Sequence, residues 1–268
     1  MKGKVVIITG GSSGIGKACA EEFGNKGAKI VITGRNRVNL DETALLLKSK
    51  GITVLAIQAD SAKEEDNEML VNETIKAFGR IDILINNAGI SMRALFTDAD
   101  LGVLKKVMDI NFYGTVYATK YALPEIIKNK GSVVGVSSIA GSVGLPGRTG
   151  YSASKFAMNG FLEALRIELL CKNVHVLVAC PGFTTSNIRN TSLSKDGSII
   201  GESSMDEGKM MSAEEVALNI YKAVEQRKRD LVLTSQGKST IFLKKFFPSL
   251  VDRVVFNHIS KEKDSPLK

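Results

Sequence analysis

Seven short apolar runs recur along the chain, separated by longer stretches whose apolar positions repeat at helical spacing. The short runs are continuously apolar and rich in β-branched residues, which is typical of strands buried on both faces of a sheet. They cover residues 5–9, 29–33, 54–58, 81–86, 132–137, 174–179 and 230–234, and the helical stretches cover residues 15–26, 38–50, 63–78, 99–129, 152–172 and 213–227. This alternation predicts an α/β fold with a parallel sheet and helices on both faces.

No internal repeat or low-complexity linker interrupts the alternation, so we expect one domain spanning residues 1–268. A single α/β domain can be of that length. Two stretches break the rhythm. Residues 183–211 are rich in Ser, Thr, Gly and Asn, and we expect a substrate lid there because such a long loop in a compact domain is usually functional. Residues 238–268 form a basic and aromatic C-terminal extension.

The composition excludes several classes of protein. With 44% hydrophobic and 24% charged residues, the chain is typical of a globular protein and unlike a disordered or fibrous one. It has three cysteines and two histidines, none at metal-ligand spacing, so we expect neither a disulfide framework nor a metal site. The N-terminal residues lack the pattern of a signal peptide, and no run of about 18 apolar residues occurs. We therefore expect a cytoplasmic protein.

The net charge of +8 is unevenly distributed. Residues 222–268 hold 11 of the 36 basic side chains but only 5 of the 28 acidic ones. Most of the excess therefore lies in the last fifth of the chain. A nucleic-acid-binding protein is expected to spread basic residues over its main binding face, so we expect no nucleic-acid partner.

The first predicted strand leads into a glycine-rich turn that precedes a helix. Glycines there permit a tight turn and a close approach of the backbone to a pyrophosphate, and the helix N-terminus adds N–H donors. Its position after the first strand favours dinucleotide binding. The candidate cofactor-binding residues of this turn are Gly10, Ser12, Ser13, Gly14, Ile15 and Gly16.

The residues after the second strand indicate which dinucleotide binds. An acidic side chain at this point would hold the ribose 2′-hydroxyl of NAD. The chain instead has Arg35 and Arg37, and its next acidic residue is Asp41. A guanidinium group suits the geometry of a 2′-phosphate. Arg35 therefore favours NADP(H) over NAD(H), the alternative being a solvated loop arginine.

Tyr151 and Lys155 stand four residues apart at the start of a predicted helix, so they face the same way. A nearby ammonium group and a bound nicotinamide cation would lower the pKa of the tyrosine, to about 7 if they are strong enough. Tyr151 could then exchange a proton with a carbonyl or alcohol oxygen while hydride moves to or from the cofactor. Ser138, at the end of the fifth strand, can hydrogen-bond that oxygen. Asn111 is a candidate for holding a water molecule that connects Lys155 to solvent.

In this combination the sequence resembles the short-chain dehydrogenase/reductase family in its compact single-domain form, over residues 3–235. Five motifs in order carry the resemblance. They are the glycine turn, an adenine-contacting acid at Asp60, a sheet-stabilising motif with Asn87, Ala88 and Gly89, the catalytic set of Asn111, Ser138, Tyr151 and Lys155, and the turn Pro181-Gly182 beside the nicotinamide. Thr184 and Ser186 follow as further cofactor-binding candidates. Ser186 stands where the family often has threonine, and it keeps a hydroxyl for the carboxamide.

The resemblance implies a three-layer Rossmann fold with a seven-stranded parallel sheet. It implies hydride transfer between a nicotinamide and a ketone or secondary alcohol, with Tyr151 and Lys155 also contacting the cofactor. Homodimers or homotetramers are frequent in the family, and here they would form through the helices expected at residues 99–129 and 152–172.

Three loops are expected to wall the substrate pocket, at residues 90–96, 140–150 and 183–211. They carry mostly apolar candidates and few charges, which favours a hydrophobic ketone, although several of these side chains could simply pack a lid or a dimer. We expect Arg93 and Arg148 to be solvated loop charges rather than a clamp for an anion. The apolar candidates are Met92, Leu95, Phe96, Val143, Leu145, Phe183 and Met205.

The extension interleaves apolar residues with Lys244, Lys245 and Arg253, and Pro248 is suited to start a helix. A basic amphipathic helix can lie in a membrane interface, so peripheral membrane contact through residues 238–260 is one expectation. The segment resembles the tail of membrane-associated steroid and lipid reductases of the family. Packing over a partner subunit, or capping of the substrate pocket, stays open as the alternative.

The leading functional hypothesis is an NADP(H)-dependent oxidoreductase of lipid metabolism that reduces the ketone of a bulky apolar molecule, such as a long-chain 3-keto lipid or a steroid-like compound. A 3-oxoacyl thioester is the alternative substrate. A nucleotide-sensing protein without turnover is disfavoured because the full catalytic set is present. A peripheral membrane scaffold that uses only the extension is the third reading.

Overall fold

The seven predicted strands pair in parallel within one sheet, in the order β3-β2-β1-β4-β5-β6-β7. The computed structural model describes residues 1–185, 187–201, 210–262 and 264–268. Each strand falls at its predicted place, with ends shifted by one or two residues. The strands are β1 (Val5–Ile8), β2 (Lys29–Gly34), β3 (Val54–Gln58), β4 (Ile83–Asn86), β5 (Ser132–Val136), β6 (His175–Cys180) and β7 (Asp230–Val232).

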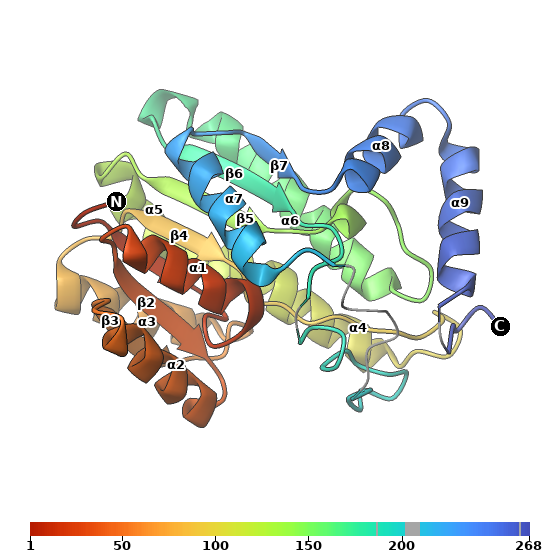
Figure 1. Cartoon of the computed structure of the whole chain (residues 1–268), viewed down its shortest axis with the longest axis horizontal. Coiled ribbons are helices and arrows are strands. Elements are labelled where there is room, and N and C mark those ends of the chain that lie inside the picture. The colour runs from red at the N-terminus through yellow and green to blue at the C-terminus, as the bar shows by residue number, and fades with distance from the viewer. Residues whose placement is uncertain (186, 202–209, 263) are drawn as a thin grey trace.

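Helices cover both faces of the sheet, as predicted (Figure 1). Alternate residues of each strand point to opposite faces, so Val6 and Ile8 belong to one apolar core and Val5 and Ile7 to the other. The first core packs against α1 (Gly14–Asn25), α2 (Arg37–Ser49) and α7 (Ala213–Glu225). The second packs against α3 (Glu64–Phe78), α5 (Gly114–Lys128) and α6 (Thr149–Glu168). The predicted three-layer Rossmann architecture is confirmed.

The prediction of one regular helix over residues 99–129 is wrong in one respect. The segment consists of α4 (Leu101–Met108), a π-helical turn at Asp109–Tyr113, and α5. The π-helical turn contains Asn111, whose side chain is buried. This side chain forms two hydrogen bonds with the backbone of Ile90. A π-turn within a helix is often a functional feature, and this one lies beside the candidate site.

The helix predicted at residues 152–172 begins earlier, because α6 starts at Thr149. Tyr151 therefore lies in its first turn. At the other end, α6 gives way to a 3₁₀ turn at Leu170–Lys172, and Asn173 then adopts a left-handed backbone with a φ of 54°. That turn ends the helix and leads the chain into β6.

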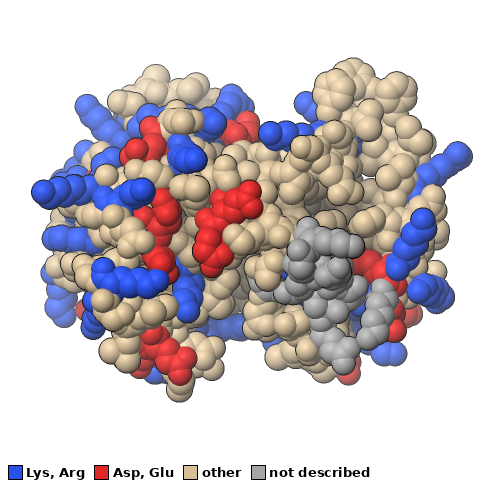
Figure 2. All heavy atoms as spheres, viewed as in Figure 1, with Lys and Arg blue, Asp and Glu red and all other residues tan. Residues whose placement is uncertain are grey.

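The C-terminal extension forms two helices, α8 (Ser235–Lys244) and α9 (Pro248–Ser260), at the end of the molecule away from α2 (Figure 1). Pro248 begins α9, as the sequence predicts. On the face seen in Figure 2, the lobe formed by α8 is mostly uncharged surface. Among the described residues, no helix combines the length and the apolar character needed to cross a membrane.

The carboxyl ends of β1 and β4 are joined by the buried side chain of Thr9. Its hydroxyl oxygen accepts hydrogen bonds from the backbone N–H groups of Asn87 and Ala88, both at 3.0 Å. The Asn87 amide in turn donates to the carbonyl oxygens of Thr9 and Gly10, at 3.0 and 3.1 Å. The glycine turn after β1 and the segment after β4 are thereby held against each other at the edge of the sheet where ligands bind in open α/β folds.

Replacing Thr9 with valine keeps the shape of the side chain but removes the acceptor for two backbone N–H groups. We expect Thr9→Val to lower the free energy of unfolding by about 1–3 kcal/mol, because partly buried donors lose their partner. Urea denaturation measures this, with the exposed Thr53→Val as the matched control. A loss no larger than that of the control would contradict the role assigned to the Thr9 hydroxyl.

Candidate active site

The glycine turn after β1 forms one side of a large open cavity. Gly10 and Gly14 have φ angles of +64° and +50°, which L-residues rarely adopt. A Cβ atom at Gly16 would lie only 2.3 Å from the carbonyl oxygen of Gly10, so that position needs glycine for the close approach of turn and helix. The cavity has a volume of about 880 Å³, and its lining includes Gly10, Ser12, Ser13, Gly14, Ile15, Arg35, Asp60, Asn87, Ala88 and Gly89.

The residues at the end of β2 line the same cavity. Arg35 and Asn36 line the cavity. Residues 33–40, at the end of β2 and directly after it, include no Asp or Glu that could hold a 2′-hydroxyl. Gln58 fixes the Arg35 carbonyl with a hydrogen bond of 2.9 Å. Arg37 is engaged elsewhere, because its guanidinium pairs with Asp41 at 2.7 Å. Together with the backbone cradle at Gly10 and Gly16, these groups fit a dinucleotide.

A second cavity of about 150 Å³ adjoins the first. The two cavities share lining residues Ile15, Asn87 and Gly89, so they are parts of one continuous crevice. The smaller cavity is lined by predicted residues from three places in the chain: Ser138 after β5, Tyr151 and Lys155 on α6, and Pro181, Gly182 and Thr184 after β6. The structure therefore brings these six predicted residues together.

Burial raises the pKa of the Tyr151 hydroxyl. The lowering expected from the sequence includes the charge of a bound nicotinamide and stays a prediction. The phenolate would lose its hydration in this site, and that effect outweighs the side-chain hydrogen bond with Ser138 and the charge of Arg148, both of which lower the pKa. Ser138 is itself fixed, since its Oγ accepts the N–H of Ala140 at 3.1 Å. In this environment Tyr151 is a neutral phenol, which can donate a proton.

Lys155 is buried beneath the same site. Its Nζ donates to the carbonyl oxygen of Val136 at 2.9 Å and lies 5.8 Å from the centre of the Tyr151 ring. Burial lowers its pKa to about 8, because the ammonium group is removed from water. A group with such a pKa can exchange protons near neutral pH.

The buried Asn111 joins the loop after β4 to α6. Its Oδ1 accepts from the Ile90 N–H at 2.8 Å, and its Nδ2 donates to the Ile90 carbonyl at 3.0 Å and to Ser154 Oγ at 2.9 Å. Ser154 donates in turn to the Tyr151 carbonyl at 2.7 Å. Asn111 thus holds the active-site edge together, and its role toward a water molecule stays a prediction.

Some predicted site residues lie elsewhere. Gly16 and Asn111 line neither cavity, and Ser186 and Met205 lie outside the described residues. Of the apolar substrate candidates, Leu145 and Phe183 do line the smaller cavity. The others do not: Met92 and Val143 are buried in the protein interior, Phe96 is exposed, and Leu95 is half-buried away from the cavity.

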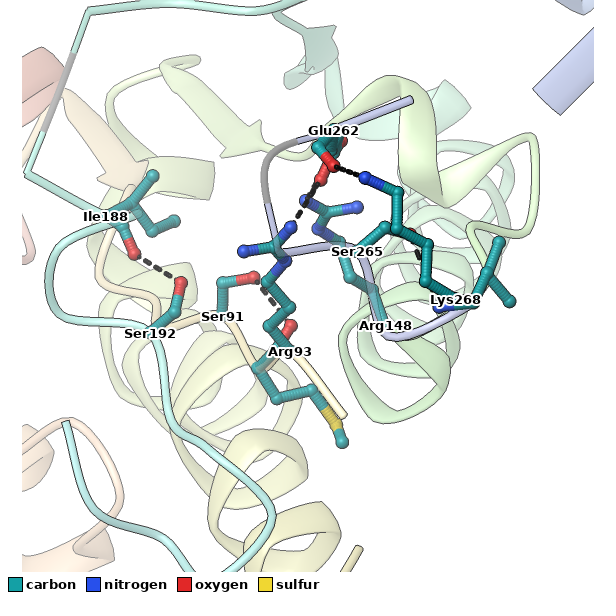
Figure 3. Close-up of polar contacts among 10 residues, drawn as sticks. Ser91, Arg93, Arg148, Ile188, Ser192, Glu262, Ser265 and Lys268 are labelled. Atoms are coloured by element: carbon teal, nitrogen blue, oxygen red, sulfur yellow. Dashed lines mark hydrogen bonds and ion pairs between the residues drawn. The ribbon is translucent and has the colours of Figure 1, made fainter. Parts of the chain in front are cut away.

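The prediction that Arg93 and Arg148 are solvated loop charges is wrong. Both side chains line the smaller cavity and are only 12% exposed. Each pairs with the Glu262 carboxylate, at 3.2 Å from Arg93 and 3.0 Å from Arg148 (Figure 3). The extension returns to the site beyond α9 and supplies this counter-ion, which nothing near the arginines in the sequence reveals.

Several residues of the site escape sequence reasoning. Thr9 and Ser154 act through backbone contacts that carry no spacing signal of their own. Arg189 lines the smaller cavity and donates to the Thr184 carbonyl at 2.7 Å, and its signal was only a cation within the expected lid. Glu262 had a weak signal, as one of few acidic residues in a basic tail.

Comparison with known proteins agrees with this geometry. The family model described as short chain dehydrogenase matches residues 4–197. The mouse protein "Dehydrogenase/reductase SDR family member 7B" is 36% identical over 271 residues, which cover 99% of this chain and 84% of that protein. "11-beta-hydroxysteroid dehydrogenase 1A" of Arabidopsis thaliana is 35% identical, with coverage of 93% of this chain and 74% of that protein.

Among solved structures, a short chain dehydrogenase/reductase from Burkholderia phymatum in complex with NAD has the same fold. Its TM-score is 0.85 at 22% identity, and the match covers 93% of this chain and 95% of that one. The fold, the family model and the relatives lead to the same conclusion: the chain belongs to the short-chain dehydrogenase/reductase family and is an oxidoreductase of that family.

Proposed function

We propose that this enzyme uses NADPH to reduce a ketone on a bulky hydrophobic molecule. The observation that carries the proposal is the meeting of Ser138, Tyr151 and Lys155 in one small cavity that opens into the larger glycine-lined cavity. A proton donor therefore lies beside the place where a nicotinamide fits. The alternative of a nucleotide sensor without turnover offers no reason for a buried tyrosine and lysine at this point.

The proposed chemistry divides between the cofactor and the chain. A reduced nicotinamide, when bound, supplies the hydride that adds to the carbonyl carbon. Ser138 donates a hydrogen bond to the carbonyl oxygen and stabilises the negative charge that develops there. Tyr151 transfers its phenolic proton to that oxygen, which gives the alcohol and a phenolate. The raised pKa of Tyr151 keeps the phenol protonated before the reaction, as a proton donor must be.

Lys155 has two roles in this proposal. As a cation it stabilises the phenolate left on Tyr151, and its lowered pKa of about 8 lets it return a proton at neutral pH. It would also contact the cofactor, as the family resemblance implies. Asn111 keeps the loop after β4 and the first turn of α6 in register for both roles.

The apolar lining of the smaller cavity supports a hydrophobic substrate. Val136, Leu145, Phe183, Ile188 and Ile200 face it. One relative is named for a hydroxysteroid, which is consistent with a steroid-like or lipid-like ketone here. The described residues 183–185 and 187–201 supply much of this wall and support the proposed lid. A 3-oxoacyl thioester is the second candidate substrate, and its acyl chain would use the same wall.

The outward face of the extension supports peripheral contact with a membrane. Phe246 and Phe247 are 63% and 57% exposed, and Phe242, Leu250 and Val254 are exposed around them. Lys245 lies among them, so the patch could meet an anionic lipid surface. We further propose a homo-oligomer through the helical segments predicted at residues 99–129 and 152–172. The exposed side chains of Tyr113 in the first segment and Ile167 in the second support it.

Reductase activity and cofactor choice are tested together with Arg35→Ala. The wild-type protein should oxidise NADPH faster than NADH with a long-chain methyl ketone, and acetone should be a poor substrate. In Arg35→Ala the KM for NADPH should rise by about tenfold to a hundredfold, because a charge-assisted hydrogen bond to the 2′-phosphate is lost, while the KM for NADH stays unchanged. Arg37→Ala is the control. Preference for NADH would overturn the NADP(H) assignment.

The burial of Lys155 predicts a measurable cost in stability. Its pKa of about 8 in the fold is below its usual 10.5, so the unfolded chain binds more protons between those values and stability rises with pH in that window. Lys155→Met should therefore be more stable than wild type by about 1–3 kcal/mol at pH 7. The difference should shrink as pH approaches 10.5.

Urea denaturation at both pH values checks this, with the exposed Lys222→Met as the control. A Lys155→Met protein less stable than wild type at neutral pH would contradict this prediction. It would show that contacts of the ammonium group outweigh the cost of its burial.

Membrane contact is tested by co-sedimentation with liposomes that contain phosphatidylserine. Wild-type protein should sediment, and the double variant Phe246→Ser/Phe247→Ser should bind at least about tenfold more weakly, because the transfer of two aromatic side chains is lost. Leu45→Ser, which removes an exposed apolar side chain from α2, is the matched control. Equal binding by all three proteins would show that Phe246 and Phe247 of the extension do not contact the membrane.

A further inference from the structure

The C-terminal extension inserts a carboxylate between two arginines of the smaller cavity (Figure 3). Arg93 belongs to the segment after β4, and Arg148 directly precedes α6, three residues before Tyr151. Arg93 Nη2 lies 3.2 Å from Glu262 Oε2, and Arg148 Nη2 lies 3.3 and 3.0 Å from the two oxygens. The contacts join three segments that are far apart in the sequence.

Two neighbouring guanidinium groups form a binding site for an anion such as a carboxylate, because both donate charge-assisted hydrogen bonds. Both arginines line the cavity that contains Tyr151, so an acidic group on a substrate could reach the same pair. The chain fills this site with its own carboxylate. No Asp or Glu lines the cavity among the described residues, and the Glu262 carboxylate pairs with both arginines.

The contact is firmly built. The Glu262 side chain is only 4% exposed, and Ile259 and Ser265 on either side of it are buried. Lys268 Nζ lies 3.4 Å from the Glu262 carbonyl oxygen. Pro266 packs against the loop before α6, because a Cβ atom at Gly147 would lie 2.7 Å from its Cγ. Pulling Glu262 out would therefore also unpack the end of the chain.

The electrostatics favour the same reading. Burial lowers the pKa of Arg93, and the charge of Arg148 lowers it further. The charge and hydrogen bond of Glu262 oppose both effects, and the charge of Asp264 adds to this opposition. Separating a buried ion pair leaves uncompensated charges in a medium of low dielectric, which is strongly unfavourable. A substrate anion would have to displace a tethered, desolvated competitor.

We propose that Glu262 is a specificity-determining residue, an internal counter-ion that occupies the arginine pair and so restricts the cavity to uncharged ligands. The inference deepens the proposed function, on which its reference to substrates rests. The expected preference for uncharged ligands follows from the two ion pairs of Glu262 and does not depend on the reaction. Removing the carboxylate while keeping the side-chain shape should turn the same cavity into a site for acidic ligands.

Titration calorimetry of the full-length protein with decanoate and decanol tests this without any turnover. Wild-type protein should bind decanol more tightly than decanoate. In Glu262→Gln the affinity for decanoate should rise by about tenfold to a hundredfold, the effect expected of charge-assisted hydrogen bonds. The affinity for decanol should stay within about twofold.

Two further variants identify the cause. Asp252→Asn, which neutralises an exposed carboxylate on α9, should leave both affinities unchanged. The double variant Glu262→Gln/Arg148→Leu should lose the gain for decanoate. Tighter binding of decanoate than of decanol by wild type would overturn the proposal without recourse to any variant, as would a Glu262→Gln protein that gains nothing. A protein that shows these affinities for decanol and decanoate but reduces no ketone would contradict the proposed function and leave the role of Glu262 intact.

Discussion

A single buried hydroxyl, that of Thr9, joins the ends of β1 and β4, two of the strand ends that carry the site. It accepts two backbone N–H groups from the segment after β4, and the Asn87 amide returns two bonds to the turn after β1. The cofactor turn and the loop that Asn111 anchors are therefore fixed relative to each other. Tyr151 and Lys155 reach this edge from α6, through Ser154 and Asn111. The geometry needed for hydride and proton transfer thus depends on a few polar contacts at one edge of the sheet.

Burial gives this edge its chemical character. The same loss of water raises the pKa of Tyr151 and lowers that of Lys155, so both groups are pushed toward their neutral forms. A neutral phenol beside a lysine that can lose its proton is suited to deliver a proton to a developing alkoxide. Charge pairing continues in the smaller cavity, where Glu262 balances Arg93 and Arg148. The apolar ketone proposed as substrate would therefore meet paired arginines there.

The features that the sequence predicted are those fixed by short-range geometry. The glycine turn, the spacing of Tyr151 and Lys155, and the strand-helix alternation each depend on neighbouring residues, so a single sequence carries them. The π-turn at Asn111 depends on a bond to Ile90, twenty-one residues away. The pairing of Glu262 with Arg148 spans 114 residues and forms only when α8 and α9 bring the chain end back to the site. Such contacts produce no periodic pattern in the sequence. The sequence alone therefore predicts that Arg93 and Arg148 are solvated.

The central claim is that hydride reaches a ketone while Tyr151 supplies the proton. The most direct test follows deuterium from NADPH labelled at the transferable position into a long-chain methyl ketone, with wild type and Tyr151→Phe compared. With wild type, deuterium is expected on the carbon that bears the alcohol. With Tyr151→Phe, the alcohol should form about a hundredfold to ten-thousandfold more slowly, while the affinity for NADPH stays unchanged. Equal rates for the two proteins, or an alcohol without deuterium, would contradict the central claim.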